Sequence, residues 1–382
     1  MEPIIIIGTG LAGYNLAREF RKLDQTTPLL LITSSDGSFY SKPMLSNALA
    51  KDKTADGLIT SDATKMATDL NAEIMGFTRV QGIDTKSHCI NTSQGDTIHY
   101  QKLVLAMGAE PIQPPLSGDG VELIYTVNDL HDYREFRDAL NGVRHVAIIG
   151  PGLIGCEFAN DLLSAGYEVS VIGPDVTPLG RLLPPAAGEM MQESLAAAGV
   201  RWHLQRNCYE VNKVGPKFIL KLDQGEAVEA DLVLSAIGLR PDLGLARSAG
   251  LKTNLGIVVD RYLATSDADI YALGDCAEVD GRMLPFIMPL MQCTRALART
   301  LAGETTAVNY PAMPVVVKTP ACPCVIAPPA PTSEGEWQVE QTGDGVKALY
   351  ISKAGDLLGF ALLGTAVAQK QALTKGLPAV MA

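Results

Sequence analysis

The chain has 382 residues, 47% of them hydrophobic and 5% aromatic, and a formal net charge of −11 at pH 7. That length suffices for two or three domains with large cores, and the acidic balance excludes a nucleic-acid-binding protein, which needs a basic face. No apolar run approaches the roughly 18 residues of a membrane-spanning helix.

The start of the chain and its cysteines bear on the compartment. Met1-Glu2-Pro3 leads straight into an apolar run, without the basic segment or cleavage site of a signal peptide, so we expect a cytoplasmic protein. The seven cysteines are scattered, and the close pair Cys322-Pro323-Cys324 has no further metal-type ligands at regular spacing nearby. We therefore expect reduced thiols and no metal site.

The first predicted element is a strand over Ile4 to Ile7 that ends in a glycine-rich loop. Four consecutive β-branched residues without alternation are typical of a parallel strand buried on both faces. Gly8 would form the tight turn, Gly10 would let the backbone approach a pyrophosphate, and Gly13 would let the helix that begins at Leu11 pack closely on the strand. Taken alone, this fingerprint is equally consistent with an ordinary glycine-rich turn.

The strand after the first helix is predicted over residues 29–33 and is followed by Ser34-Ser35-Asp36. In the dinucleotide-binding fold an acidic residue about 20 positions past the glycines holds the adenosine ribose, which makes Asp36 a candidate, although it comes slightly late. A solvated turn aspartate is an equal alternative. The loop 38–46 comes next and contains Lys42, which precedes a proline.

Two strands that end on glycine mark the limits of the middle of the chain. The first covers 103–107 and ends at Gly108, and a proline-rich linker follows it; the second covers 232–236 and ends at Gly238. Because the two endings resemble each other, we interpret them as crossings between domains.

A second copy of the glycine fingerprint lies between these crossings, 142 positions after the first (150 minus 8). The run His145 to Ile149 leads into Gly150, Gly152 and Gly155, and Gly166 to Ile172 supplies the next strand. Two nucleotide-binding units in one chain predict two dinucleotides that meet.

The last part of the chain contains a short strand, a helix and a small third unit. The stretch 265–277 is a strand whose Gly274-Asp275 end places a carboxylate at a loop tip. A helix follows Pro289, which is tolerated at a helix start because its missing N–H costs nothing there. From Val315 onward, several short strands and a closing helix near 365–375 are predicted.

These motifs together resemble a flavoprotein family with two dinucleotide-binding folds, the pyridine-nucleotide-dependent disulfide reductases and their ferredoxin- and rubredoxin-reducing relatives. The resemblance covers essentially the whole chain and rests on both fingerprints and on Ile270-Tyr271-Ala272-Leu273-Gly274-Asp275. The segments 40–46 and 274–278, and above all Val317-Lys318-Thr319-Pro320, are similar to those of the short bacterial NADH:rubredoxin reductases.

The fold class implied by this resemblance is α/β, with two Rossmann-like dinucleotide-binding domains and a small α+β C-terminal domain. The FAD-binding domain would be discontinuous and cover 1–114 and 245–317. The NAD(H)-binding domain would cover 115–244, and the C-terminal domain 318–382.

The resemblance also implies two cofactors, FAD in the first unit and NADH in the inserted one. FAD would be bound tightly without a covalent link, since no histidine or cysteine lies beside the fingerprint. The residues expected to bind the two cofactors are Gly8, Gly10, Leu11, Ala12, Gly13, Ser34, Asp36, Lys42, Pro43, Ala106, Gly108, Gly150, Gly152, Leu153, Ile154, Gly155, Glu157, Asp175, Gly238, Gly274, Asp275, Pro289 and Lys318.

Three of these residues are the implied catalytic ones, Lys42, Glu157 and Lys318. Lys42 would lie near flavin N5, Glu157 near the nicotinamide and the flavin, and Lys318 at the N1–C2=O end of the flavin, where positive charge stabilises the reduced ring. Each has an ordinary alternative. An acid in the first turn of a helix is favourable in any case, and exposed lysines are the commonest lysines.

The implied reaction is hydride transfer from NADH to flavin N5, followed by transfer of single electrons to rubredoxin, for example in a chain to an alkane hydroxylase or an oxygen- or NO-detoxifying system. The alternatives are a ferredoxin or flavorubredoxin as acceptor, or an NADH-sensing flavoprotein with negligible turnover. We expect a monomer, with no nucleic acid and no membrane span.

The sequence also predicts a preference for NADH over NADPH. A 2′-phosphate needs arginines just after the second strand of its unit, and 173–180 contains no basic residue, whereas Asp175 would repel the phosphate. Arg181 is the one reservation. For docking of an acidic rubredoxin, the candidates for a local basic patch are Lys42, Lys51, Lys53, Arg295, Arg299 and Lys318.

Overall fold

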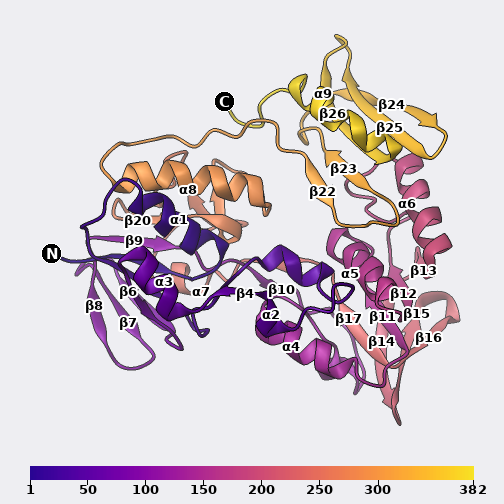
Figure 1. Ribbon diagram of the computed structural model, residues 1–382, viewed down its shortest axis with the longest axis horizontal. Coiled ribbons are helices and arrows are strands. Elements are labelled where there is room, and N and C mark those ends of the chain that lie inside the picture. The colour runs from indigo at the N-terminus through magenta and orange to yellow at the C-terminus, as the bar shows by residue number, and fades with distance from the viewer.

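The chain forms three units, each built around one main sheet, which Figure 1 shows at the left, the lower right and the upper right. The computed structural model describes the backbone of residues 1–382 and the side chains of all but residue 342. Among the helices that it describes, none combines the length and apolar character needed to cross a bilayer.

The sheet of the first unit is parallel and is built around β1 (Ile4–Ile7), whose four isoleucines are all buried. Burial on both faces explains why the strand is apolar without alternation. Its strands, in spatial order, are β20 (Ile270–Ala272), β9 (Lys102–Leu105), β1, β2 (Leu29–Ile32) and β5 (Glu73–Met75). One of these strands comes from the part of the chain after the second unit.

Helices and small sheets cover both faces of this central sheet. The helices α1 (Leu11–Arg21) and α8 (Ile287–Leu301) pack against each other on one face, and the antiparallel strands β6 (Val80–Asp84), β7 (Cys89–Thr92) and β8 (Thr97–His99) lie on the other. The remaining elements are β3 (Phe39–Tyr40), the 3-10 helix η1 (Lys42–Asn47), α2 (Ala55–Leu58), β4 (Ile59–Ser61), α3 (Ala63–Leu70), α7 (Gly244–Ser248), β19 (Ile257–Val259), the 3-10 helix η4 (Gly274–Cys276) and β21 (Ala277–Val279).

The second unit repeats the strand, glycine loop and helix of the first. Its parallel sheet has the order β13 (Val200–Leu204), β12 (Glu168–Gly173), β11 (His145–Ile149) and β17 (Leu232–Ser235). Helices α4 (Leu130–Ala139), α5 (Leu153–Ser164) and α6 (Pro185–Ala198) belong to this unit, together with the antiparallel strands β14 (Cys208–Val214), β15 (Lys217–Leu222) and β16 (Ala227–Ala230) and the 3-10 helices η2 (Val121–Leu123) and η3 (Asp223–Gly225).

The two crossings between these units lie side by side. β10 (Glu110–Pro111) pairs antiparallel with β18 (Leu239–Arg240), with Glu110 opposite Arg240. The chain therefore enters and leaves the second unit at one place.

The third unit is an antiparallel sheet that packs on α6. Its strands, in spatial order, are β22 (Val315–Val317), β23 (Cys324–Ala327), β26 (Leu357–Gly364), β25 (Gly345–Ser352) and β24 (Gly335–Thr342), and it ends with the 3-10 helix η5 (Thr365–Gln369) and α9 (Lys370–Lys375). β22 pairs with β23 through Val317 and Cys324, so this sheet begins at Val315. The chain end returns to the first core, where the buried Met381 pairs with Tyr310.

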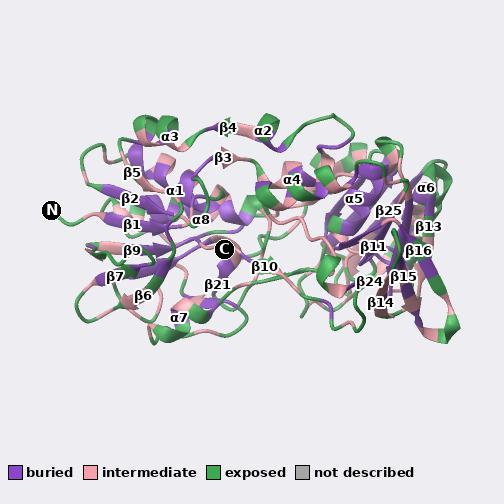
Figure 2. Ribbon diagram, turned by 90° about the horizontal axis from the view of Figure 1, so that it is seen from below, coloured by how far each residue is buried: buried purple, intermediate pink, exposed green. Residues whose placement is uncertain are grey.

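Burial follows the three sheets, as Figure 2 shows, with exposed residues concentrated in the connecting loops. One close approach lies in the second unit, where the end of β12 meets the glycine loop after β11. A Cβ atom added at Gly173 would lie 2.1 Å from Cδ of Pro151. The proline ring therefore requires glycine as the last residue of β12.

We predict that Gly173→Ala destabilises the second unit by about 1–3 kcal/mol, the usual cost of overpacking a tight site. Urea denaturation followed by circular dichroism measures the change. Pro151→Ala in the same chain removes the ring and should restore most of the loss, because the two positions are in direct contact. A Gly173→Ala variant as stable as the parent would contradict this prediction.

Candidate active site

The two glycine loops have the same backbone and the same neighbours. Gly8 and Gly150 have φ of 113° and 115°, which L side chains rarely adopt. A Cβ at Gly8 would lie 2.2 Å from the carbonyl oxygen of Ala106, and one at Gly150 would lie 2.5 Å from that of Ala236. Each loop therefore packs on the chain that leaves the neighbouring strand, β9 or β17, as close backbone approach requires.

The next glycines bring each helix onto its loop and leave its first turn open. Cβ atoms at Gly13 and Gly155 would each lie 1.9 Å from a loop carbonyl oxygen, whereas Cβ atoms at Gly10 and Gly152 would meet nothing within 4 Å. Gly10 and Gly152 are the N-caps of α1 and α5, and neither receives a side-chain cap. The free N–H groups and the positive end of each helix suit a pyrophosphate, so both loops fit a dinucleotide.

The first residues of the two helices are the predicted binding residues Leu11 and Ala12 in α1 and Leu153 and Ile154 in α5. The structure brings the Gly274 turn against the first of these helices, since a Cβ at Gly274 would lie 3.0 Å from Cβ of Ala12.

Asp275, in this turn, and Lys42 are two half-buried charges that interact electrostatically. Burial lowers the pKa of the Lys42 ammonium, although the carboxylates of Asp275, Asp129 and Asp132 oppose the shift. Burial likewise raises the pKa of the Asp275 carboxyl, opposed by the charge of Lys42. Lys42 is thus not an ordinary surface lysine.

Asn128, which precedes α4 in the second unit, holds the Lys42 ammonium. Nζ of Lys42 donates to Oδ1 of Asn128 over 2.6 Å, and Nδ2 of Asn128 donates to the carbonyl oxygen of Ala109 over 3.0 Å. The backbone N–H of Asn128 donates to Asp132 over 2.8 Å. Sequence analysis did not identify Asn128, because it lies 86 positions from Lys42 in a segment without a recognisable motif.

Glu157 is 1% exposed and joins segments from all three units. Its carboxylate lies 2.6 Å from Nζ of Lys318, and it accepts hydrogen bonds from the backbone N–H of Lys318 over 2.9 Å and from Oγ of Ser46 over 2.6 Å. Lys318 Nζ also donates to Ser46 and to the carbonyl oxygen of Pro43. The predicted residues Glu157, Lys318 and Pro43 are therefore in one hydrogen-bonded cluster.

Two further polar residues of α5 continue this contact. Asp161 is 3% exposed and accepts hydrogen bonds from the backbone N–H groups of Leu49 and Ala50 over 2.9 and 3.0 Å, while Oδ1 of Asn160 accepts from the N–H of Ala321. Burial raises the pKa of the Asp161 carboxyl, against these hydrogen bonds. The spacing of 157, 160 and 161 on an otherwise apolar helix is the signal that could have revealed this polar face.

The remaining predicted binding residues lie at strand ends or helix starts. Ser34 and Asp36 follow β2, and both oxygens of the Asp36 carboxylate accept hydrogen bonds from Ser38 at 2.9 Å, so this side chain also caps its own turn. The others are Ala106 and Gly108 after β9, Asp175 after β12, Gly238 after β17 and Pro289, the third residue of α8.

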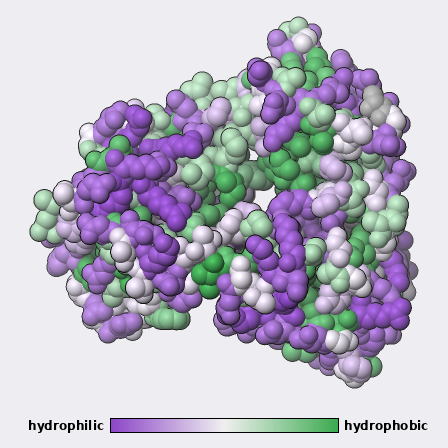
Figure 3. All heavy atoms as spheres, in the orientation of Figure 1, coloured by the Kyte–Doolittle hydropathy of each residue, from purple (hydrophilic) through white to green (hydrophobic). Residues whose placement is uncertain are grey.

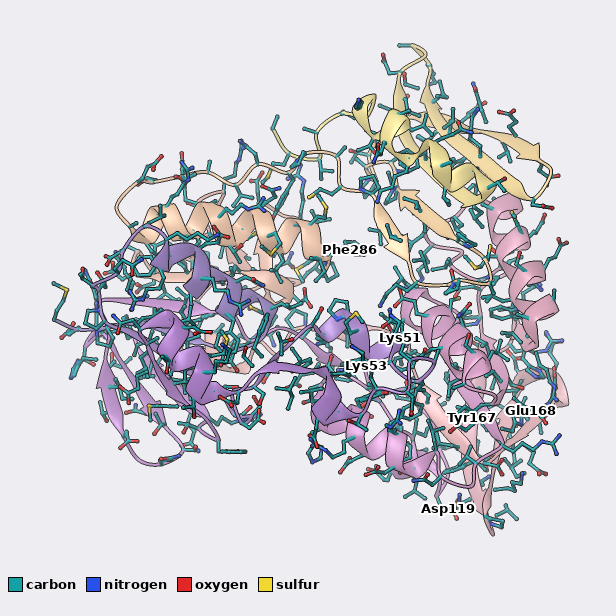
Figure 4. All side chains as sticks on the ribbon, viewed as in Figure 1. Lys51, Lys53, Asp119, Tyr167, Glu168 and Phe286 are labelled. Atoms are coloured by element: carbon teal, nitrogen blue, oxygen red, sulfur yellow. The ribbon has the colours of Figure 1, made fainter. Side chains whose placement is uncertain are left out.

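The surface between the three units is hollowed, and hydrophobic atoms gather on its sides (Figure 3). Phe286 lies at the end of α8 that faces this space, and Lys51 and Lys53 lie near α5 (Figure 4). Of the six residues predicted to form a basic patch, Lys42 and Lys318 are half-buried, and their ammonium groups bind oxygens of the protein. Lys51, Lys53, Arg295 and Arg299 are exposed.

Comparison with protein families gives two matches that together cover most of the chain. Residues 2–299 match the pyridine nucleotide-disulphide oxidoreductase family, and residues 307–377 match the rubredoxin binding C-terminal domain.

Curated and solved relatives agree with these matches over nearly the full length. A rubredoxin-NAD(+) reductase of Alcanivorax borkumensis is 50% identical over 100% of both chains, and one of Acinetobacter baylyi is 46% identical over 99% of this chain and 98% of its own. A crystal structure of a ferredoxin reductase from Rhodopseudomonas palustris superposes with a TM-score of 0.86 at 25% identity, covering 95% of this chain and 91% of its own.

We predict that Lys318→Met destabilises the protein by about 3 kcal/mol, because it leaves the carboxylate of Glu157 buried without its cation. The double variant Glu157→Gln, Lys318→Met should recover most of this loss in urea denaturation, since it removes both charges. Equal stability of the single and double variants would show that the pair is not coupled.

We predict a local effect for Asp161→Asn, since the new amide group turns a donor toward a backbone N–H. Hydrogen exchange at the Leu49 and Ala50 amides should accelerate about tenfold to a hundredfold, the loss expected for hydrogen bonds to a buried charge. Asp138→Asn, on the exposed side of α4, removes the same charge and serves as the control. Unchanged exchange at both amides would contradict the assignment.

Proposed function

Because the chain belongs to the pyridine nucleotide-disulphide oxidoreductase family, we propose that it is an FAD-dependent reductase that transfers electrons from NADH to rubredoxin. The support for rubredoxin is twofold. The third unit matches a rubredoxin-binding domain, and the relatives at 50% and 46% identity over the full length are rubredoxin reductases. The observation that carries the redox part is the duplicated glycine loop, which fits two dinucleotides in one chain.

The proposed division of labour follows the sheets. Residues 1–114 and 245–314 bind FAD, residues 115–244 bind NADH, and the third unit, which begins at β22, contacts the acceptor. We propose the cytoplasm as the compartment, since all seven cysteines are free thiols, as expected where the environment is reducing.

When bound, FAD supplies the conversion of a two-electron hydride donor into a one-electron donor. The protein's own groups bind and orient. The glycines of both loops and the open first turns of α1 and α5 would hold the two pyrophosphates, and the Asp275 carboxylate would accept a hydrogen bond from a hydroxyl of the ribitol chain.

The charged groups of the site set its electrostatics. Asn128 holds the ammonium group of Lys42, and Glu157 holds that of Lys318. Their positive charges would favour negative charge on the reduced flavin ring. The seam along α5 fixes the second unit against the first, so that hydride donor and acceptor meet in one geometry.

The decisive experiment is NADH-dependent reduction of a panel of acceptors by the purified, flavin-loaded protein. We expect rapid reduction of rubredoxin and of ferricyanide, and slow reduction of a [2Fe–2S] ferredoxin. Because the exposed lysines and arginines are screened by salt, rubredoxin turnover should fall as ionic strength rises, and ferricyanide turnover should not fall in parallel.

Other outcomes separate the alternatives. A ferredoxin reduced as fast as rubredoxin, or no reduction of rubredoxin at all, would refute the acceptor while leaving an NADH-dependent flavoprotein. Negligible turnover with ferricyanide would instead identify an NADH-sensing protein.

A further inference from the structure

The end of β12 is the place where a Rossmann-type unit recognises the adenosine ribose. Here that strand ends at Gly173, which has no side chain, and the ring of Pro151 occupies the space that a Cβ would need. An acid in the strand's last position is therefore excluded. The nearest carboxylate along the chain is the half-buried Asp175, two residues later.

The neighbouring strand brings an arginine to the same place. β13 pairs in parallel with β12, with Leu204 opposite Gly173, and the chain beyond it stays attached. The backbone N–H of Arg206 donates to the carbonyl oxygen of Gly173 over 3.1 Å. The backbone N–H of Gln205 donates to the carbonyl oxygen of Asp175, also over 3.1 Å. Arg206 thus lies beside the strand end although it is 33 positions away in sequence.

The guanidinium of Arg206 is already engaged by a carboxylate. Its Nε lies 3.1 Å from Oε2 of Glu226, and its Nη1 donates to the carbonyl oxygen of Gln205 over 3.0 Å. The other oxygen of Glu226 lies 2.6 Å from Nδ1 of His203. His203 and Arg206 hold the pKa of the Glu226 carboxyl below its ordinary value, so this carboxylate is charged at neutral pH.

We propose that Glu226 is a specificity-determining residue, which prevents Arg206 from binding the 2′-phosphate of NADPH and so enforces the use of NADH. The inference rests on the proposed binding of NADH by residues 115–244. It extends that proposal by naming the residue that rejects the phosphorylated cofactor.

The charges at the strand end support this role. Asp175, Glu226 and Arg206 together carry a net charge of −1. This charge repels the 2′-phosphate of NADPH but does not repel the uncharged 2′-hydroxyl of NADH. A guanidinium binds a phosphate through paired hydrogen bonds only if its N–H groups are free. Two of the five Arg206 N–H groups already donate to Glu226 and Gln205, and the negative charge of Glu226 offsets the positive charge that would attract the phosphate.

The test compares Glu226→Gln with Glu229→Gln. Glu229 lies on β16, the strand that begins directly after Glu226, and pairs with Lys217, so the second variant removes the same charge away from Arg206. For each flavin-loaded variant, kcat/KM is measured for NADPH and NADH with ferricyanide as acceptor. Calorimetry then measures the binding of adenosine 2′,5′-bisphosphate and of AMP.

For Glu226→Gln we expect the NADPH to NADH ratio of kcat/KM, and the preference for the bisphosphate over AMP, to rise about tenfold, the scale of one charge-assisted contact. Glu229→Gln should leave both unchanged. Adding Arg206→Ala to Glu226→Gln should abolish the gain, whereas Arg206→Ala alone should change the ratio less than about twofold.

No gain in Glu226→Gln, an equal gain in Glu229→Gln, or a gain that survives Arg206→Ala would overturn the proposal. A large loss in Arg206→Ala alone would also overturn it, because Arg206 would then already bind the cofactor. Since ferricyanide replaces rubredoxin, a protein that fails to reduce rubredoxin still gives a valid result.

Discussion

The arrangement of the three units depends on a rule about buried charge, which must be paired or hydrogen-bonded because its desolvation is costly. Helix α5 carries Glu157, Asn160 and Asp161 on one face, all 5% exposed or less. None of their partners is on α5 itself. The first unit supplies Ser46 and the amides of Leu49 and Ala50, and the segment after β22 supplies Lys318 and Ala321. All three segments must therefore be in place at once for these polar groups to be hydrogen-bonded. These directional bonds fix how the segments align, which nonspecific apolar contact would not do.

The elements that sequence analysis predicted well are those specified by adjacent residues. The four isoleucines of β1 can be buried only in the middle of a parallel sheet, and the spacing of Gly8, Gly10 and Gly13 makes sense only against a strand and a helix. The fold class and the family follow from these local patterns, and the comparisons confirm them. The start of the third sheet is not specified in this way, because strand pairing across a loop, Val317 with Cys324, decides where that sheet begins.

The parts of the site that escaped prediction depend on contacts between distant positions. From sequence, Lys42 and Lys318 could be assigned equally to the surface or to the site. Only their hydrogen-bond partners, 86 and 161 positions away, show that they belong to the site. Asn128 lies in the segment before α4, where nothing nearby marks it, and Asp161 is marked only by its spacing from Glu157 and Asn160 on α5. Arg206 approaches Gly173 only because β13 lies beside β12. Strand order is a tertiary property that the glycine spacing does not encode.

The paired crossings β10 and β18 have a consequence for how such a chain arose. Because Glu110 and Arg240 face each other, the chain between them begins and ends at the same place. If that segment were removed, a short turn could join the two adjacent ends. The same geometry lets the second unit lie within the sequence of the first without disturbing the sheet of the first unit. Strand β20 still joins that sheet, although it follows the second unit in sequence. The inserted sheet, β13-β12-β11-β17, repeats the order of β5, β2, β1 and β9 in the first sheet and has no counterpart of β20.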